Sequence, residues 1–376
     1  MDMKERLERL KARRDPDNIE SEGDEITPKT LAAIIADCDN PEELDEVLDM
    51  AGGLELYREY ITLANTPIFG ISNEDYKEAL SYTLTRIIAF IKRWAKVLAA
   101  ADLRLAVNAA HCQALVDTLH AEVRAVGHAK SGTFTLDSRM ANLCINYRPM
   151  KDPVSLINGL TTLSRVVSAY FGAHTATVGA ARGIIELTSN LTNVDGLTQR
   201  LLAIDIPSHF NSAVFRPVDG RIESLHLLGN HKLVVLKPDE GASPYDAVTA
   251  TKIRIEMSQL TPGPVPTSIE FPHFDVTTND VLTDLLSKII GAATATNTGT
   301  VRAQRRQALN ELTNALDRAN NSIKFNDTLD PIKVKETAVL LETYIAWIAD
   351  PYTDFFAYIL RDVRAVINVC AGNISQ

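Results

Sequence analysis

A stretch from Ser72 to Gly127 without a single helix breaker constrains this chain more than any other feature. Pro67 and Gly70 are the last breakers before it, and Gly127 is the first after it. Glycine and proline are the residues that most strongly interrupt helices. The sequence therefore predicts one very long helix here, or two helices nearly in line.

Apolar residues within this stretch recur at alternating spacings of four and three. A seam kept at 3.5-residue spacing predicts burial against partner helices in left-handed, coiled-coil-like packing. We favour the central helix of one helical domain over an exposed rod used for oligomerisation. Only two of the expected seam residues are polar, Asn108 and Glu122, and the seam comprises Leu80, Leu84, Ile87, Ile91, Trp94, Leu98, Ala101, Leu105, Asn108, Cys112, Leu115, Leu119, Glu122 and Val126.

The composition is that of a folded protein with room for two or three packed units. The chain has 376 residues, of which 45% are hydrophobic and 23% charged. Its formal net charge of −10 argues against non-specific binding to duplex DNA, which needs a concentrated basic face. The net charge does not exclude a local basic patch.

The spacing of the cysteines and the length of the apolar runs indicate the cellular compartment. Cys38, Cys112, Cys144 and Cys370 show neither zinc-ligand spacing nor a disulfide framework, which favours buried thiols in a reducing compartment. The N-terminus lacks an apolar signal core, and no run reaches the roughly 18 apolar residues that span a bilayer. We expect a cytoplasmic protein, or one assembled from the cytoplasm into a particle, with no membrane contact.

The pattern predicts a mainly α protein, a long-helix bundle with a small antiparallel β-sheet inserted (α+β). The expected segments are a charged N-terminal arm (1–26), a helical bundle around the long helix (27–129), a second helical segment (130–206), a small antiparallel β module (207–275) and a C-terminal helical bundle (276–376). The second segment opens on Thr133–Leu136, which we expect to be extended, and on a short helical turn over Met140–Ile145.

The arm begins with an amphipathic helix, Met1–Arg14, that carries Leu7 and Leu10 among basic residues including Arg13 and Arg14. Asp15-Pro16 stops it. The acidic linker that follows leaves two readings open: the helix docks on a partner, or it is a solvated tail.

A second long helix, a sheet and four further helices follow from the spacing. Asp152-Pro153 begins a long helix with Val154, Leu160, Phe171 and His174 on its expected face. Beyond Pro207 the period becomes two, which predicts strands Ile222–Leu228, Lys232–Lys237 and Lys252–Met257, with Val214–Arg216 as a fourth. Gly229-Asn230 is typical of a hairpin turn. Helices are expected over residues 277–290, 301–322, 331–349 and 352–371.

The chain shows no motif of a known chemistry. His111, His120 and His128 are spaced so that a helix turns them to different faces, which argues against a shared metal. Nucleophile-elbow, Walker, Rossmann and zinc-protease signatures are absent. We therefore expect no catalytic residues, no cofactor, no metal and no small-molecule substrate, although an enzyme with a dispersed site remains a third hypothesis.

Two charged clusters are candidates for contact with a partner. Dense acids occur between Asp37 and Asp49 at a helix start, where a solvated face is favoured over an ion site. Arg302, Arg305 and Arg306 form the sharpest basic cluster. It has no interleaved aromatic residues, so nucleic acid stays possible but unsupported. The expected partner contacts are Leu7, Leu10, Arg13, Arg14, Arg302, Arg305 and Arg306.

The order of elements resembles that of virion structural proteins of large tailed bacteriophages, of the internal head type. The residues that carry this resemblance are Ser138–Leu143, Val154–Tyr170 and the hairpin module Phe215–Leu236 with Leu228-Gly229-Asn230-His231. It implies a non-enzymatic structural or assembly protein that acts through helical protein–protein interfaces and resides in the virion. The alternative is a cytoplasmic adaptor or regulatory binding protein of phage or bacterial origin.

Overall fold

The computed structural model describes residues 73–126, 131–137, 139–180, 184, 192–257, 265–295, 300–323, 330–349 and 351–375. All of them belong to one compact unit, Ser72–Gln376, while Met1–Ile71 form another. The expected arm with Leu7, Leu10, Arg13 and Arg14, the helices before residue 72 and Cys38 lie outside the described residues. The segment boundaries at 130, 207 and 276 stay predictions.

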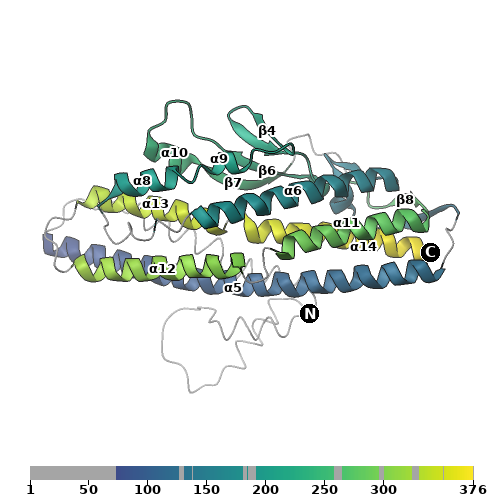
Figure 1. Ribbon diagram of the computed structural model, residues 1–376, viewed down its shortest axis with the longest axis horizontal. Coiled ribbons are helices and arrows are strands. Elements are labelled where there is room, and N and C mark those ends of the chain that lie inside the picture. Colours follow the sequence, from purple (N-terminus) through teal and green to yellow (C-terminus); the bar gives the residue numbers. More distant parts are fainter. Residues whose placement is uncertain are drawn as a thin grey trace, which may run out of the picture. The chain divides into compact units, whose positions relative to one another are not determined.

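The described chain is mainly helical with small antiparallel sheets, and one helix dominates it (Figure 1). Helix α5 (Asn73–Val126) runs for 54 residues, which confirms a single long helix. Three later helices pack against it: α11 (Val276–Ala295), α12 (Thr300–Ile323) and α14 (Tyr352–Ser375). Helix α6 (Pro153–Ala180) lies on α11, and α13 (Pro331–Ala349) contacts α6 and α8 (Val194–Leu202).

Helices α12 and α11 cover successive parts of α5. Three pairs join α12 to the earlier part of α5: Asn320 with Thr85, Asp317 with Lys92, and Arg305 with Asp102. Two others join α11 to the later part: Ser287 with Gln113, and Thr283 with His120. At 1.5 Å per residue α5 is about 81 Å long, whereas α11 and α12 are about 30 and 36 Å. Two shorter helices are therefore needed to cover the long one.

Between Leu105 and Val123, the buried seam of α5 has the predicted period but not the predicted phase. Outside this range Ile91 is buried as predicted, and the side chains of the other predicted seam residues lie outside the described ones. One column is as expected: Leu105, Cys112 and Leu119. The other is shifted by one residue, from Asn108, Leu115 and Glu122 to Ala109, Val116 and Val123. The shift has a simple cause, because it moves an amide and a carboxylate out of the interior and replaces them with alanine and valine. Glu122 is exposed and Asn108 half-buried.

Local signals explain where α6 begins. The Asp152 carboxylate accepts hydrogen bonds from the Ser155 main-chain N–H at 2.8 Å and from the Ser155 hydroxyl at 2.6 Å. This is N-terminal capping followed by proline in the first turn, as expected. Leu160, Phe171 and His174 are buried as predicted, but Val154 in the first turn is 67% exposed.

The predicted sheet is present as a four-stranded antiparallel meander. Its strands, β4 (Phe215–Val218), β5 (Arg221–Ser224), β6 (His231–Leu236) and β7 (Lys252–Met257), pair in chain order. The inner face is apolar, with Ile222 opposite Val235 and Val235 opposite Ile253, all buried. The indole N–H of Trp347 in α13 donates to the main-chain oxygen of Thr251 at 2.9 Å, which fixes α13 beside β7.

The connection from β5 to β6 differs from the predicted tight hairpin. Strand β5 ends at Ser224, and the chain passes through a short 3-10 turn, η4 (Leu228–Asn230), before β6. Gly229 and Asn230 do adopt positive φ, 68° and 66°, as the Gly-Asn pair predicts. The Ser224 hydroxyl accepts from the Leu233 N–H and donates to the Leu225 carbonyl. The Ser224 hydroxyl thus replaces a main-chain group as the hydrogen-bonding partner of Leu233, and β5 ends at this serine.

Small elements join the remaining parts. The expected extended segment is β1 (Thr133–Leu136), and it pairs antiparallel with β8 (Ile269–Pro272). The expected turn is η2 (Met140–Leu143), followed by a hairpin of β2 (Cys144–Ile145) and β3 (Arg148–Pro149). Helices α8, α9 (Ile206–His209) and α10 (Pro244–Ala250) were not predicted from the sequence. None of the described helices combines the length and apolar character needed to cross a membrane.

Candidate functional site

Strained backbone gathers where the β elements meet α14. Turns η2 and η4 and strand β2 contact one another, and α14 packs on η2. Four of the six described non-glycine residues with positive φ lie in or directly beside these segments: Arg139, Asn146, Tyr147 and Asn230. Such conformations cost of order 1–3 kcal/mol each and persist only where the surroundings enforce them. The Asn230 side chain supplies one such restraint by accepting from the Tyr147 N–H at 2.6 Å.

At this place a polar group surrounds one buried carboxylate, and we call it the Asp362 cluster: Asn142, Gly229, His231, Tyr358 and Asp362. Asp362 of α14 is completely buried and accepts from the Asn142 amide at 3.0 Å. Burial raises the pKa of Asp362 to about 7, although the neighbouring Asn142 and Tyr358 groups oppose the shift. The carboxyl therefore exchanges its proton near neutral pH.

Gly229 closes this cluster from the side of the sheet. A Cβ at this position would lie 3.0 Å from the Tyr358 ring and 3.1 Å from an Asp362 oxygen. Its φ of 68° also favours glycine. Both constraints favour glycine at this position. Because glycine has no side chain, the main chain of the Leu228-Gly229-Asn230 turn can approach α14 closely.

His231 and Tyr358 complete the cluster. Their rings meet edge to face with centroids 4.5 Å apart. Burial lowers the pKa of His231, and burial together with the Asp362 carboxyl raises that of Tyr358 well above its usual value. A carboxyl, an imidazole and a phenol in contact would suit proton transfer in an open cleft. Asp362 is 0% and Tyr358 3% exposed, so here they join the sheet to α14.

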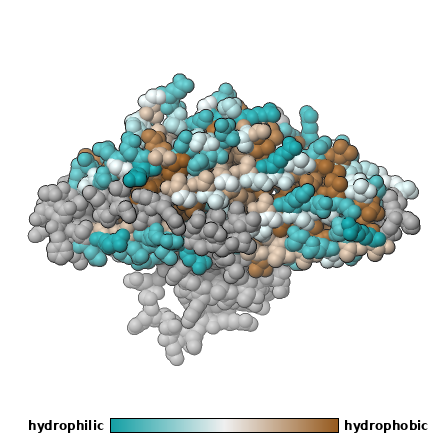
Figure 2. All heavy atoms as spheres, viewed as in Figure 1, coloured by the Kyte–Doolittle hydropathy of each residue, from teal (hydrophilic) through white to brown (hydrophobic). Residues whose placement is uncertain are grey.

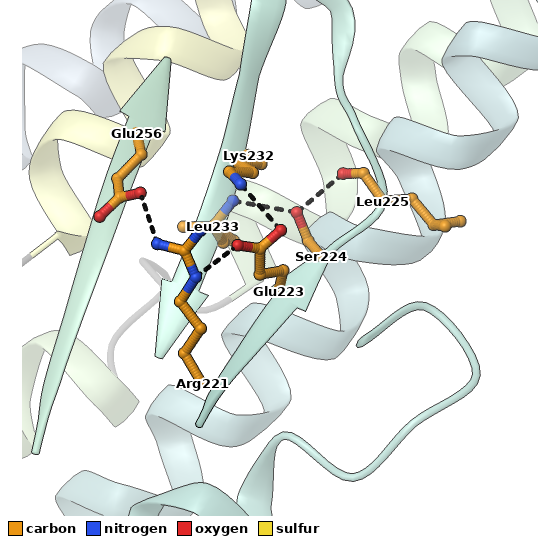
Figure 3. A network of polar contacts seen from close by, with 7 residues as sticks. All are labelled: Arg221, Glu223, Ser224, Leu225, Lys232, Leu233 and Glu256. Carbon is orange, nitrogen blue, oxygen red and sulfur yellow. Dashed lines mark hydrogen bonds and ion pairs between the residues drawn. The ribbon is translucent and has the colours of Figure 1, made fainter. Parts of the chain in front are cut away.

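The opposite face of the sheet carries a second polar group, shown in Figure 3. The Glu223 carboxylate receives Arg221 Nε at 2.7 Å on one oxygen and Lys232 Nζ at 2.8 Å on the other. Arg221 also reaches Glu256 of β7 at 3.6 Å. Lys232 is 3% exposed, and a buried ammonium needs such a partner. Glu223 therefore pairs with two cations, shares Arg221 with Glu256, and ties β5 to β6.

Arg305, expected to contact a partner, is instead inside the protein. It is 3% exposed, and its guanidinium pairs with Asp102 of α5 at 3.2 Å and donates to the Ile348 carbonyl at 3.1 Å. The expectation that Arg305 meets a partner is therefore wrong. The physical reason is that Arg305 lies on the apolar stripe of α12, with Ala308, Leu309 and Leu312 on the same buried face.

The Arg305 guanidinium also begins a stack of rings from two other helices. It lies 4.1 Å from the ring centre of Tyr352, whose ring meets that of His174 at 4.8 Å. Burial and the positive charge of Arg305 lower the pKa of His174 to about 3, so this histidine is neutral. Arg305 of α12 thus contacts α5, α13 and α14 directly, and Tyr352 extends the connection to α6.

The other members of the predicted basic cluster have different positions. Arg306 is exposed and available to a partner, while the side chain of Arg302 lies outside the described ones. His111 is exposed and His120 half-buried beside Thr283 and Asp280. Cys112, Cys144 and Cys370 are buried free thiols. Within the described ranges, no cluster of three or more His, Cys, Asp or Glu side chains has an arrangement suited to a metal ion.

Comparison with known proteins adds no relative: the sequence matches no family model, and neither the curated proteins nor the solved structures give a match. The functional argument therefore rests on the geometry above.

Replacing Gly229 by alanine tests the close approach to α14. The control is Gly220→Ala, because Gly220 has a φ of 77° but nothing within 4 Å of its would-be Cβ. Positive φ alone should cost each variant about 1–2 kcal/mol. Crowding against Tyr358 should add about 1–3 kcal/mol to Gly229→Ala. Urea denaturation measures both, and equal losses would contradict the close approach.

The raised pKa of Asp362 predicts a stability that falls with rising pH. The carboxyl of the unfolded chain loses its proton near pH 3.8, whereas the native carboxyl keeps its proton up to about pH 7. Wild type should therefore lose free energy of unfolding relative to Asp362→Asn across that window, by roughly 4 kcal/mol at most, and change no further above it. Denaturation at a series of pH values measures this difference.

Asp275→Asn provides a control of opposite sign. Hydrogen bonds from Thr278 lower the pKa of Asp275, so its contribution is present above the unfolded pKa near 3.8 and is lost as the solution becomes more acidic. A pH-independent difference between wild type and Asp362→Asn would show that Asp362 does not titrate in this window.

Removing one partner of the buried ion pair should be far more costly than removing one of an exposed pair. Asp102→Asn leaves the Arg305 charge uncompensated in the interior, and we expect a loss of about 3–5 kcal/mol. Lys92→Met breaks the pair with Asp317, whose side chains are 55% and 45% exposed, and should cost less than about 1 kcal/mol. Similar losses in the two variants would rule out the structural role given to Arg305.

Proposed function

We propose that the protein is a non-enzymatic structural or assembly protein of a virion, of the kind found in large tailed bacteriophages. In this proposal it acts through protein–protein interfaces and is assembled in the host cytoplasm. Its helices α5, α6, α11, α12, α13 and α14 form a long-helix bundle that serves as a rigid support, with the sheet presented on it.

One observation carries this proposal: the charged groups that join the helices and the sheet are closed off from solvent. Asp102, Arg305 and Asp362 are at most 4% exposed and are held by partners from other elements. Perturbed ionisable groups occur both in active sites and in structural networks. Burial on this scale favours the structural reading, because a substrate must reach the group that acts on it.

The surface of the helices offers places for contact. Figure 2 shows hydrophobic residues interspersed with hydrophilic ones on one face. Among the described residues, the large apolar side chains that are most exposed are Val107 of α5 (61%), Val154 of α6 (67%) and Ile332 of α13 (69%). Single exposed apolar residues are common on monomers, so these three do not by themselves show an interface. They are the positions at which an interface can be tested by mutation.

Size-exclusion chromatography with multi-angle light scattering tests the proposal on the full chain. We expect a defined oligomer over a wide range of concentrations. The double variant Val154→Asp with Ile332→Asp should reduce its mass, because a carboxylate in an apolar contact is desolvated without a partner. The matched control is Asn158→Asp with Lys333→Asp, at exposed positions on the same helices. A wild type that stays monomeric at every concentration would overturn self-assembly and favour an adaptor.

A further inference from the structure

The charge of this chain is segregated along the sequence. Residues 1–57 contain 17 acidic and 7 basic residues, and residues 58–376 contain 31 of each. The whole net charge of −10 thus lies in the first 57 residues. The acids occur in two runs without any lysine or arginine: six in residues 15–25 and eight in residues 30–57.

The outer face of the sheet has the opposite charge. It carries five basic residues against two acidic ones, and we call it the basic sheet face: Arg216, Arg221, Glu223, Lys232, Lys252, Arg254 and Glu256. Register places these residues together, because residues directly opposite on paired strands share a face. Arg216 is opposite Glu223, Glu223 opposite Val234, and Val234 opposite Arg254.

Three cations on this face are not compensated within the described part of the chain. Glu223 is already engaged by Arg221 and Lys232, and Glu256 by Arg221. Arg216, Lys252 and Arg254 are exposed and form no ion pair with a described residue. Strands lie about 4.8 Å apart, so Arg216 and Arg254 at the two edges are about 14 Å from each other. Val234 between them is buried, so this spacing suits a segment whose carboxylates reach the cations on the two edge strands.

The chemistry of the face favours carboxylates over nucleic acid. None of the outward positions of the four strands is aromatic, so the face has no platform on which bases could stack. Arginine binds carboxylates through two parallel hydrogen bonds, which gives orientation as well as attraction. An acidic protein segment is therefore the better match.

We propose that the basic sheet face binds the acidic segment, residues 15–57, of a second copy of this chain. The inference rests on the proposed assembly function and names the contact that would drive it. Such a contact is heterologous, since two different surfaces of each copy are used, and it lets copies add head to tail in a ring or a filament. Charge segregation within one sequence is what such a contact requires.

A charge swap in the full chain tests this. The face-reversed variant carries Arg216→Glu, Lys252→Glu and Arg254→Glu, and the segment-reversed variant carries Glu42→Lys, Glu43→Lys and Glu46→Lys. Each alone should lose the oligomer seen by light scattering, because like charges then face each other. An equimolar mixture should regain it, since each variant offers what the other lacks. Matched exposed cations on the helices give the control, Arg165→Glu, Lys288→Glu and Lys333→Glu, which should leave the oligomer unchanged.

Other outcomes would overturn the inference. A wild-type oligomer that both variants retain would refute this contact while leaving the assembly function intact, whereas a monomeric wild type would remove the assembly function itself. Loss in both variants without recovery on mixing, but with recovery in the chain carrying all six substitutions, would place the contact within one chain. Binding of single-stranded DNA that the face-reversed variant alone loses would identify nucleic acid as the occupant.

Salt provides a measurement that needs no variant. The wild-type oligomer should dissociate as the salt approaches about 1 M, where the Debye length falls to about 3 Å. An oligomer that is equally stable at low and high salt would contradict a contact between charged surfaces.

Discussion

The burial of two apolar columns on α5, described from Leu105 to Val123, is the constraint on which the described structure depends. A helix of about 81 Å cannot be covered by one partner of ordinary length. Helices α12 and α11 therefore follow each other along it, and α14 packs beside them. The Asp102–Arg305 pair lies in the second turn of α12, close to where coverage by α12 gives way to coverage by α11. A charged pair at that place fixes which residues meet, a specificity that apolar columns of similar residues lack.

Much of this fold is visible in the sequence because it follows from spacing. Breaker-free length predicts α5, Asp-Pro predicts the start of α6, and strict alternation predicts β7. What spacing does not determine is phase. The columns through Asn108 and through Ala109 have the same period, and the choice between them depends on partner helices more than 150 residues away. The polar residues of the predicted column were the sign that it was wrong.

The polar clusters were harder to predict, because each joins residues that are distant in the chain. Arg305 was grouped with its neighbours Arg302 and Arg306, although its spacing to Leu309 and Leu312 would have placed it on the buried face of α12. Asp362 is an acid in the middle of a largely apolar helix, and only a search for such exceptions would have found it. The Gly229-Asn230 signal was recognised as a turn, but its second role, close approach to Tyr358, requires knowledge of what lies opposite.

The dependence of α5 on later helices has a consequence for synthesis. A ribosome makes about 5–20 residues per second, and N-terminal parts emerge first. α5 is complete at Val126, but its partners begin at Val276, about 150 residues later. For roughly 8–30 seconds its apolar columns have no native cover, and β1 likewise awaits β8. The nascent chain therefore passes through a period in which chaperones or neighbouring nascent chains compete with its own C-terminal half.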